Sequence, residues 1–89
     1  LESTIITHGL PRPRNLHVAH EVEAEVRAHG AVPATVAVLD GTLHVGLEAA
    51  QLQRLSSSPS VAKLSRADLA PCLAAGGTGA TTVAATMIC

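Results

Sequence analysis

Two charged residues, Glu2 and Lys63, stand out because each interrupts an apolar stretch of the chain. Desolvation of a carboxyl group in an apolar strand favours its protonated form, and that form suits a general acid. A solvated chain end explains Glu2 equally well from spacing alone. Lys63 is the only lysine, and its amine could form a Schiff base, bind a phosphate or simply lie at the surface. Composition alone favours the surface for Lys63.

Five histidines raise the question of a metal site. His17 and His20 lie three residues apart beside Glu21 in the order H-V-A-H-E. This order differs from H-E-x-x-H, in which the glutamate lies between two histidines one helical turn apart. We therefore expect His17 and His20 to be solvent-facing helix residues. His8, next to Gly9 at the end of an expected strand, is the histidine best placed for a pocket.

The glycine-rich stretch Gly76–Gly79 precedes an expected helix. Glycines let backbone N–H groups approach a phosphate, and the amino terminus of a helix favours an anion. The lysine of a P-loop and the third glycine of a dinucleotide fingerprint are both missing. A plain tight turn is the favoured interpretation.

Composition limits both the size of the core and the class of partner. The chain has 89 residues, a net charge of −1 and no Phe, Tyr or Trp, so its core must be aliphatic. This is typical of a piece of a larger α/β layer, and we expect residues 1–89 to be a single partial domain. The charge gives no case for nucleic acid or a membrane surface, and no apolar run reaches the about 20 residues of a membrane span.

Cys72 and Cys89 lack the spacing of a metal or redox motif. Both have apolar neighbours, which favours buried free thiols over a disulfide. An intracellular protein fits this pattern best.

Apolar periodicity and turn residues predict an α/β element order. Asn15 is the expected N-cap of the first helix, whose apolar stripe is Leu16, Ala19, Val22 and Val26, and Gly30 is its stop signal. Asp40-Gly41 predicts a hairpin turn, and Ser65 with Asp68 predicts a capping box. The expected strands are 1–7, 31–40, 42–47 and, briefly, 61–65, and the expected helices are 16–30, 48–55, 67–75 and one from residue 80 onward.

Four stretches taken in order resemble one protein family. They are LESTIITHGLPRPRN, GAVPATVAVLDGTLHVGL, KLSRADL and GATTVAATM. Together they resemble the pseudouridine-5′-phosphate glycosidases, also called indigoidine synthase A-like proteins, from Leu1 to Ile88. The resemblance implies part of a three-layer α/β/α sandwich with a mixed central sheet. It also implies that residues 1–89 are the N-terminal third of a longer domain.

The resemblance implies reversible cleavage of the C–C glycosidic bond of pseudouridine 5′-phosphate to uracil and ribose 5-phosphate. It further implies a lysine Schiff base, a proton-moving glutamate, a divalent metal that is usually Mn²⁺, and a homo-oligomer, expected to be a trimer. The chemistry requires such groups, because a carbon leaving group needs both an electron sink and a proton.

Three positions of this chain match functional positions of the family. By resemblance Glu2 is the proton donor, Lys63 binds substrate, with the phosphate as the expected group, and Val83 contacts substrate through its backbone. The Schiff-base lysine and the metal-binding aspartate fall beyond Cys89, so Lys63 is not the expected nucleophile. We therefore expect residues 1–89 alone to be inactive.

Two other functions stay open at the level of sequence. One is a catalytically inactive remnant that acts only in subunit association. The other is a small phosphate-binding module built from Lys63 and the Gly76–Gly79 loop.

Overall fold

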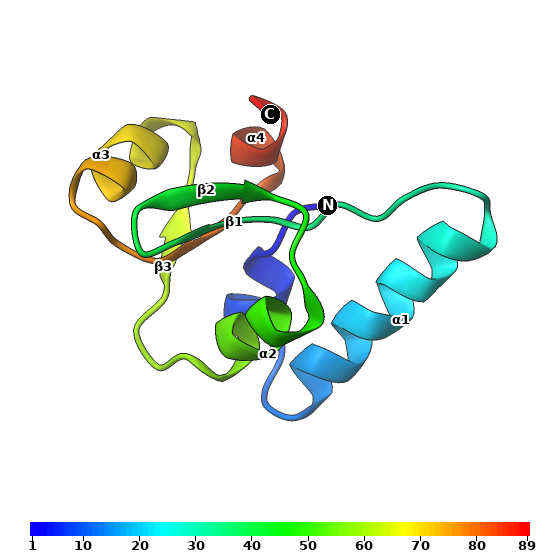
Figure 1. Ribbon diagram of the computed structural model, residues 1–89. Helices are drawn as coiled ribbons and strands as arrows, with labels where there is room; N and C mark the ends of the chain where they lie inside the picture. Colours follow the sequence, from blue (N-terminus) through cyan, green and yellow to red (C-terminus); the bar gives the residue numbers. More distant parts are fainter.

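The computed structural model describes residues 1–89 and contains ten short elements (Figure 1). In chain order they are the π-helix η1 (Ile5–Gly9), α1 (Arg14–Ala28), β1 (Val36–Leu39), β2 (Thr42–Val45), α2 (Ala49–Ser57), β3 (Ala62–Leu64), the 3₁₀ helix η2 (Arg66–Asp68), α3 (Leu69–Ala74), β4 (Gly79–Thr81) and α4 (Val83–Thr86). No helix among them has the length and apolar character needed to cross a membrane.

The four strands form one mixed sheet in the order β2-β1-β4-β3. The pairs β1–β2 and β1–β4 are antiparallel, whereas β3–β4 is parallel. All four residues of β1 are buried, as expected for an apolar strand in the middle of a covered sheet. The predicted mixed α/β fold is confirmed.

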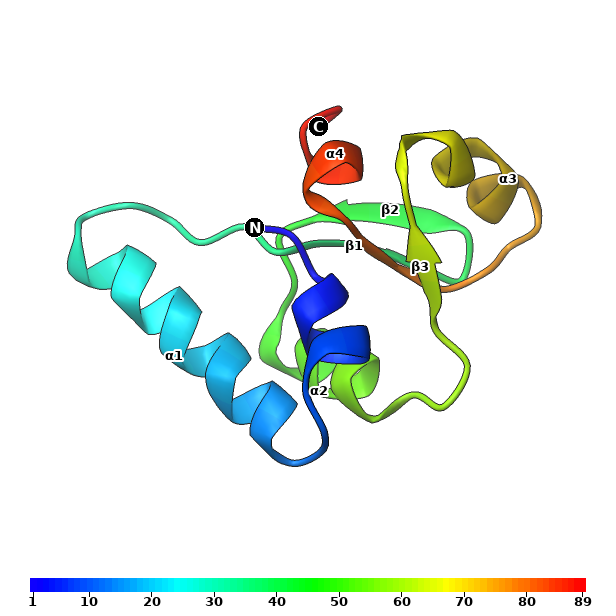
Figure 2. The ribbon, with the colours of Figure 1, turned by 180° about the vertical axis from the view of Figure 1, so that it is seen from behind.

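Helices cover both faces of the sheet. Alternate residues of β1 point to opposite sides, so each face of the strand packs against the helices on its own side. On one face, Val38 packs in a cluster with Leu64, Leu69 of α3 and Ala85 of α4. On the other face, Ala37 and Leu39 pack against Leu55 of α2. Figures 1 and 2 show α3 and α4 above the sheet and η1, α1 and α2 below it.

The expected strand over residues 1–7 is wrong, because residues 1–3 belong to no strand and the first element of the chain is η1. Leu1 accepts a hydrogen bond from the backbone N–H of Val36, and the backbone N–H of Ser3 donates to Thr81, so this start lies against the sheet. From Ile5 the chain instead forms η1. The β-branched run favours a strand locally, but helical backbone buries Ile6 against α1 and α2, and this packing overrides the propensity.

The strand β4 was not expected, because its residues were predicted to begin a helix. It lies inside the sheet, between β1 and β3. A Cβ atom on Gly79 would lie 2.5 Å from Cγ of Leu64, so the glycine leaves room for the side chain of Leu64 of β3. The predicted helix forms only after this strand, at Val83.

The helix α1 buries a different set of residues from the predicted apolar stripe. Its buried residues are Asn15, Ala19 and Glu23, whereas Val22 is 41% exposed. Asn15 is not an N-cap; it lies within α1 and donates two hydrogen bonds to carbonyls of η1 and α2. Glu23 accepts a 2.7 Å hydrogen bond from the hydroxyl of Thr35. Polar contacts therefore supplement the apolar packing of this helix.

The local turn and capping predictions are confirmed. Asp40 and Gly41 have φ values of 49° and 80° between two paired strands, as the hairpin requires. Ser65 and Asp68 form the predicted capping box. The helix α1 ends before Gly30, whose φ is 79°.

The two cysteines differ in exposure. Cys72 is half-buried, and this burial raises the pKa of its thiol. Cys89 is exposed, so the expectation that both thiols are buried is wrong for Cys89.

Candidate active-site cleft

Polar side chains from two distant parts of the sequence line one cleft. Its volume is about 160 Å³, and its lining residues are Glu2, Thr4, Ile5, His8, Gly9 and Lys63. Five of these come from the amino-terminal segment through η1, and Lys63 comes from β3. The structure thus brings together Glu2 and Lys63, two of the three residues predicted to contact substrate.

The strand β4 brings these two residues together, because it contacts β3, which carries Lys63, and also the segment that carries Glu2. Lys63 pairs with Ala80 of β4, and the backbone N–H of Ser3 donates a 2.9 Å hydrogen bond to the carbonyl of Thr81. On β3 the side chains alternate, so Leu64 enters the core while Lys63 points to the face that carries η1. The exposed ammonium group of Lys63 therefore faces the same cleft as Glu2.

The carboxyl group of Glu2 is held through one of its two oxygens. Oε2 accepts hydrogen bonds from the backbone N–H of Thr4 at 2.9 Å and from its hydroxyl at 2.6 Å. None of the four ion pairs in the structure includes Glu2 or Lys63. The cleft therefore combines a carboxyl group with a free oxygen and an unpaired ammonium group, which can exchange a proton and bind an anion respectively.

Sequence reasoning missed Thr4. A side-chain oxygen that accepts a hydrogen bond from a backbone N–H two residues later is a common motif for Asp, Asn, Ser and Thr rather than for Glu, so the spacing of Glu2 and Thr4 gave little signal. The signal was hidden because these residues were expected to be extended.

A buried hydroxyl network fixes the backbone beside Glu2. Ser3 is fully buried, and its hydroxyl donates to the carbonyl of Val36 at 2.6 Å and accepts from the N–H of Thr81 at 2.8 Å. The hydroxyl of Thr81 lies 2.8 Å from that of Thr86 in α4. The network joins the Glu2 segment to β1, β4 and α4.

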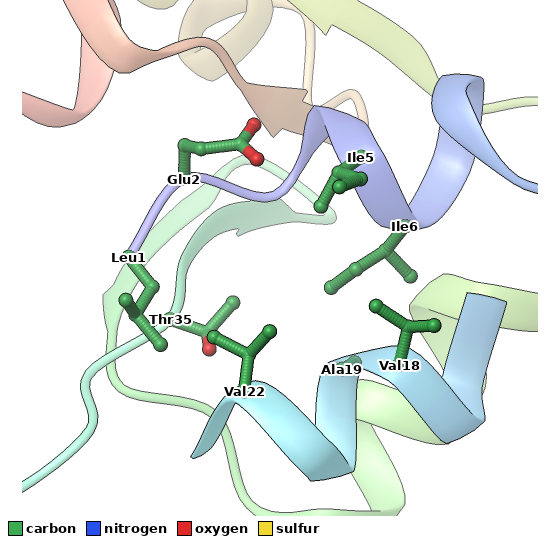
Figure 3. Close-up of a pocket in the computed structure, with 8 residues that line it drawn as sticks. All are labelled: Leu1, Glu2, Ile5, Ile6, Val18, Ala19, Val22 and Thr35. Atoms are coloured by element: carbon green, nitrogen blue, oxygen red, sulfur yellow. The ribbon is translucent and has the colours of Figure 1, made fainter. Parts of the chain in front are cut away.

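An apolar cavity of about 130 Å³ lies on the other side of the amino-terminal segment (Figure 3). It is lined by Leu1, Glu2, Ile5, Ile6, Val18, Ala19, Val22 and Thr35. Figure 3 shows the carboxylate of Glu2 pointing away from α1, while Val18 and Val22 of α1 point toward this cavity. Glu2 therefore lies at the boundary between an apolar space and the polar cleft.

The histidines separate as the sequence predicted. His8 lines the cleft, and its Nδ1 contacts the hydroxyl of Thr7. His17 and His20 are exposed on α1, and His17 pairs with Glu21 at 2.6 Å. Nowhere in residues 1–89 do three or more His, Cys, Asp or Glu side chains come together as a metal site.

The glycine loop Gly76–Gly79 leads into a strand rather than into a helix, so the phosphate cradle considered at a helix start is wrong. Its groups instead contact the β1–β2 hairpin: the carbonyl of Gly77 accepts a 2.8 Å hydrogen bond from Gly41. The loop acts as the tight turn that the sequence favoured.

Val83 does not line the cleft. It is the first residue of α4, directly after the segment that carries Thr81, and it is 62% exposed. Its substrate contact stays a prediction.

A second pair of opposite charges lies beside the hairpin, at the other end of β1 from the amino terminus. Both carboxylate oxygens of Asp40 accept hydrogen bonds from Nη2 of Arg54, at 2.8 and 2.7 Å. The hydrogen bond and the charge of Arg54 lower the pKa of Asp40, and a further hydrogen bond from Thr78 acts in the same direction.

The sequence comparisons agree on one family. The family described as "Indigoidine synthase A like protein" matches residues 1–89. A pseudouridine-5′-phosphate glycosidase from Roseobacter denitrificans is 68% identical over 88 residues, and one from Staphylococcus aureus is 54% identical over 89 residues. The matches cover 99% and 100% of this chain, respectively. The chain spans 28% and 29% of the length of these relatives.

Two solved structures share the fold. An indigoidine synthase A-like protein from Thermotoga maritima matches with a TM-score of 0.88 at 26% identity, over 98% of this chain and 30% of its own. The prealnumycin C-glycosynthase AlnA, solved in complex with ribulose 5-phosphate, matches with a TM-score of 0.80 at 40% identity, over 98% of this chain and 28% of its own.

Proposed function

The chain belongs to the indigoidine synthase A-like protein family, and from this premise we propose that it supplies part of a pseudouridine-5′-phosphate glycosidase active site. The reaction is reversible cleavage of the C–C glycosidic bond of pseudouridine 5′-phosphate to uracil and ribose 5-phosphate. The observation that carries the proposal is that Glu2 and Lys63 line one cleft without pairing with each other.

Glu2 is the proton carrier of this reaction. In the cleavage direction it adds a proton to the uracil carbon that bears the sugar, and the electrons of the C–C bond then return to the pyrimidine ring. In synthesis the same carboxylate removes that proton. Its half-buried position and its hydrogen bonds from Thr4 keep the group at one place in the cleft.

Lys63 binds the phosphate of the substrate as an ammonium group. A charge-assisted hydrogen bond to a phosphate oxygen suits an exposed lysine that has no carboxylate partner in the structure. The relative AlnA holds ribulose 5-phosphate, a sugar phosphate of the same class, which supports this assignment. Val83 adds a backbone contact to the substrate.

Two parts of the chemistry are not supplied by residues 1–89. As the electrons of the C–C bond leave with the pyrimidine ring, the sugar carbon needs an electron pair from an amine nucleophile, and the resemblance assigns that role to a lysine other than Lys63. Mn²⁺, the metal implied by the resemblance, finds no set of three ligand side chains here, so no step of the proposal uses it. We therefore expect the 89-residue chain alone to release no uracil.

A chimera tests the proposal. Residues 1–89 replace the matching segment of the Roseobacter denitrificans glycosidase, to which they are 68% identical. We expect the folded chimera to release uracil from pseudouridine 5′-phosphate, and the isolated chain, incubated with Mn²⁺, to release none. A chimera with native circular dichroism and no uracil release would contradict the proposed function. Metal-dependent release by the isolated chain would contradict the need for the remaining groups.

Association into a homo-oligomer, with a trimer expected, is a separate part of the proposal. Large apolar side chains are exposed at Val32, Met87 and Ile88, at 89%, 79% and 53%. Contact with a second copy of the protein would bury these side chains. Analytical ultracentrifugation of the chimera should give three times the mass of one chain, and a concentration-independent monomer would contradict the trimer.

A further inference from the structure

Thr4 gives two hydrogen bonds to a single oxygen of Glu2. From this geometry we infer that Thr4 is a positioning residue, which holds Oε2 so that Oε1 is the oxygen that carries the proton. The inference rests on the proposed function, which gives Glu2 the proton-transfer role. It adds a residue and an atom that the family resemblance does not assign.

The distances favour a fixed carboxyl group. The hydroxyl of Thr4 lies 2.6 Å from Oε2, within the range of an O–H donor bonded to an ionised acceptor. The backbone N–H of the same residue occupies a second lone pair of Oε2 at 2.9 Å. Because both donors act on Oε2, a proton added to the group goes to Oε1. The side-chain rotation that a glutamate normally retains is restricted at the same time.

Thr4 is itself held between two buried residues. Ser3, before it, is fully buried and bonded to β1 and β4 through its side chain. Ile6, after it, is 3% exposed, and its N–H donates to the carbonyl of Ser3 at 3.0 Å. The two donors of Thr4 therefore approach Glu2 from an anchored turn rather than from a loose chain end, so that reactants meet a preset geometry.

A purely structural role for the same contact makes a different prediction. If Thr4 serves only to begin η1, its loss lowers stability and leaves the turnover of the folded enzyme unchanged. If Thr4 positions Glu2, its loss lowers kcat and acts only while Glu2 is present.

The test uses uracil release by the chimera that contains residues 1–89. Thr4→Val keeps the shape of the side chain and removes the hydroxyl, and we expect kcat to fall about 10- to 100-fold with little change in KM. Thr4→Ser restores the hydroxyl and should recover most of the activity. Thr42→Val, on the exposed strand β2, is the matched control and should leave kcat unchanged. In a Glu2→Gln background, Thr4→Val should have no further effect.

Each other outcome overturns the inference. A normal kcat for Thr4→Val, or a Thr4→Ser variant as slow as Thr4→Val, shows that the hydroxyl does not position Glu2. A further loss in the Glu2→Gln background shows that Thr4 acts independently of Glu2. If Glu2→Gln is itself fully active, both the inference and the proposed role of Glu2 fail. A Thr4 effect that is absent while Glu2→Gln is inactive removes only the inference.

Discussion

A carboxylate and a cation lie near each end of β1, but only one of these two sets of charges forms an ion pair. At the hairpin, Asp40 is bonded to Arg54 through both oxygens and to Thr78. At the amino-terminal end, Glu2 and Lys63 share a cleft and form no ion pair. The paired charges satisfy each other, whereas the unpaired ones leave binding capacity for a ligand. This difference, rather than the presence of charge, distinguishes the candidate site from the Asp40–Arg54 pair at the hairpin, which we call the structural end.

The largest difference between the two ends should appear when each carboxylate becomes an amide. In the chimera, Glu2→Gln removes the proton carrier, and we expect kcat for uracil release to fall about 10²- to 10⁴-fold. Asp40→Asn is the matched change at the hairpin and should alter kcat less than about twofold, because Asp40 does not line the cleft and exposed ion pairs contribute little to stability. Equal losses in both variants would break the comparison.

The two cations should differ next. Lys63→Met removes the ammonium group, and we expect KM for pseudouridine 5′-phosphate to rise about 10- to 100-fold, as for the loss of a charged hydrogen bond. Arg54→Met, the control, leaves the cleft untouched and should keep KM within about twofold. Steady-state kinetics measures both. An unchanged KM for Lys63→Met would show that its charge does not bind substrate.

A third prediction concerns the buried hydroxyl network that fixes the backbone beside Glu2. Ser3→Ala removes the hydrogen-bond acceptor of the buried N–H of Thr81, whereas the carbonyl of Val36 keeps its hydrogen bond from the hydroxyl of Thr81; we expect a cost of about 1–3 kcal/mol. Thermal unfolding of the chimera should show Tm lowered by several degrees. Ser60→Ala, in an exposed loop, should leave Tm unchanged. If the Tm of Ser3→Ala equals that of Ser60→Ala, the hydroxyl network does not stabilise the cleft.

The smallest expected effect is on stability, concerns Asp40 beside Arg54, and depends on pH. Because Arg54 lowers the pKa of Asp40 in the folded chain, the unfolded chain binds more protons, and stability rises with pH in that window. The contribution is complete above the unfolded pKa of about 3.9 and is lost as pH falls through the lower folded pKa.

Asp40→Asn should therefore destabilise the chimera at neutral pH and have a smaller effect as the pH falls below about 4. Urea midpoints at several pH values measure this difference. Asp68, whose pKa is lowered by hydrogen bonds from Ser65, should show the same trend in Asp68→Asn. A difference from wild type that grows on acidification would contradict the sign.

Local chemistry made some features predictable from the sequence. The hairpin at Asp40-Gly41 follows from the need for positive φ at both positions, and the capping box at Ser65 needs only residues of one turn. An apolar strand was equally clear, because β1 is buried on both faces, although it covers only Val36–Leu39 of the expected range 31–40.

The features that sequence reasoning missed depend on contacts between distant residues. The strand β4 exists because Gly79 fits against Leu64, which lies in β3. The helix η1 forms because Ile6 packs against α1 and α2. Spacing alone could not show that Glu2 and Lys63 line the same cleft, since β4 brings their segments together. The family resemblance, rather than the spacing, identified both residues.

A crystal structure of the chimera with uracil and ribose 5-phosphate is the most direct test of the claim that Glu2 and Lys63 act on one substrate. We expect a phosphate oxygen within about 3 Å of Nζ of Lys63 and the uracil ring next to Oε1 of Glu2. A phosphate bound instead at the Gly76–Gly79 loop, with the cleft of Glu2 and Lys63 empty, would contradict the claim.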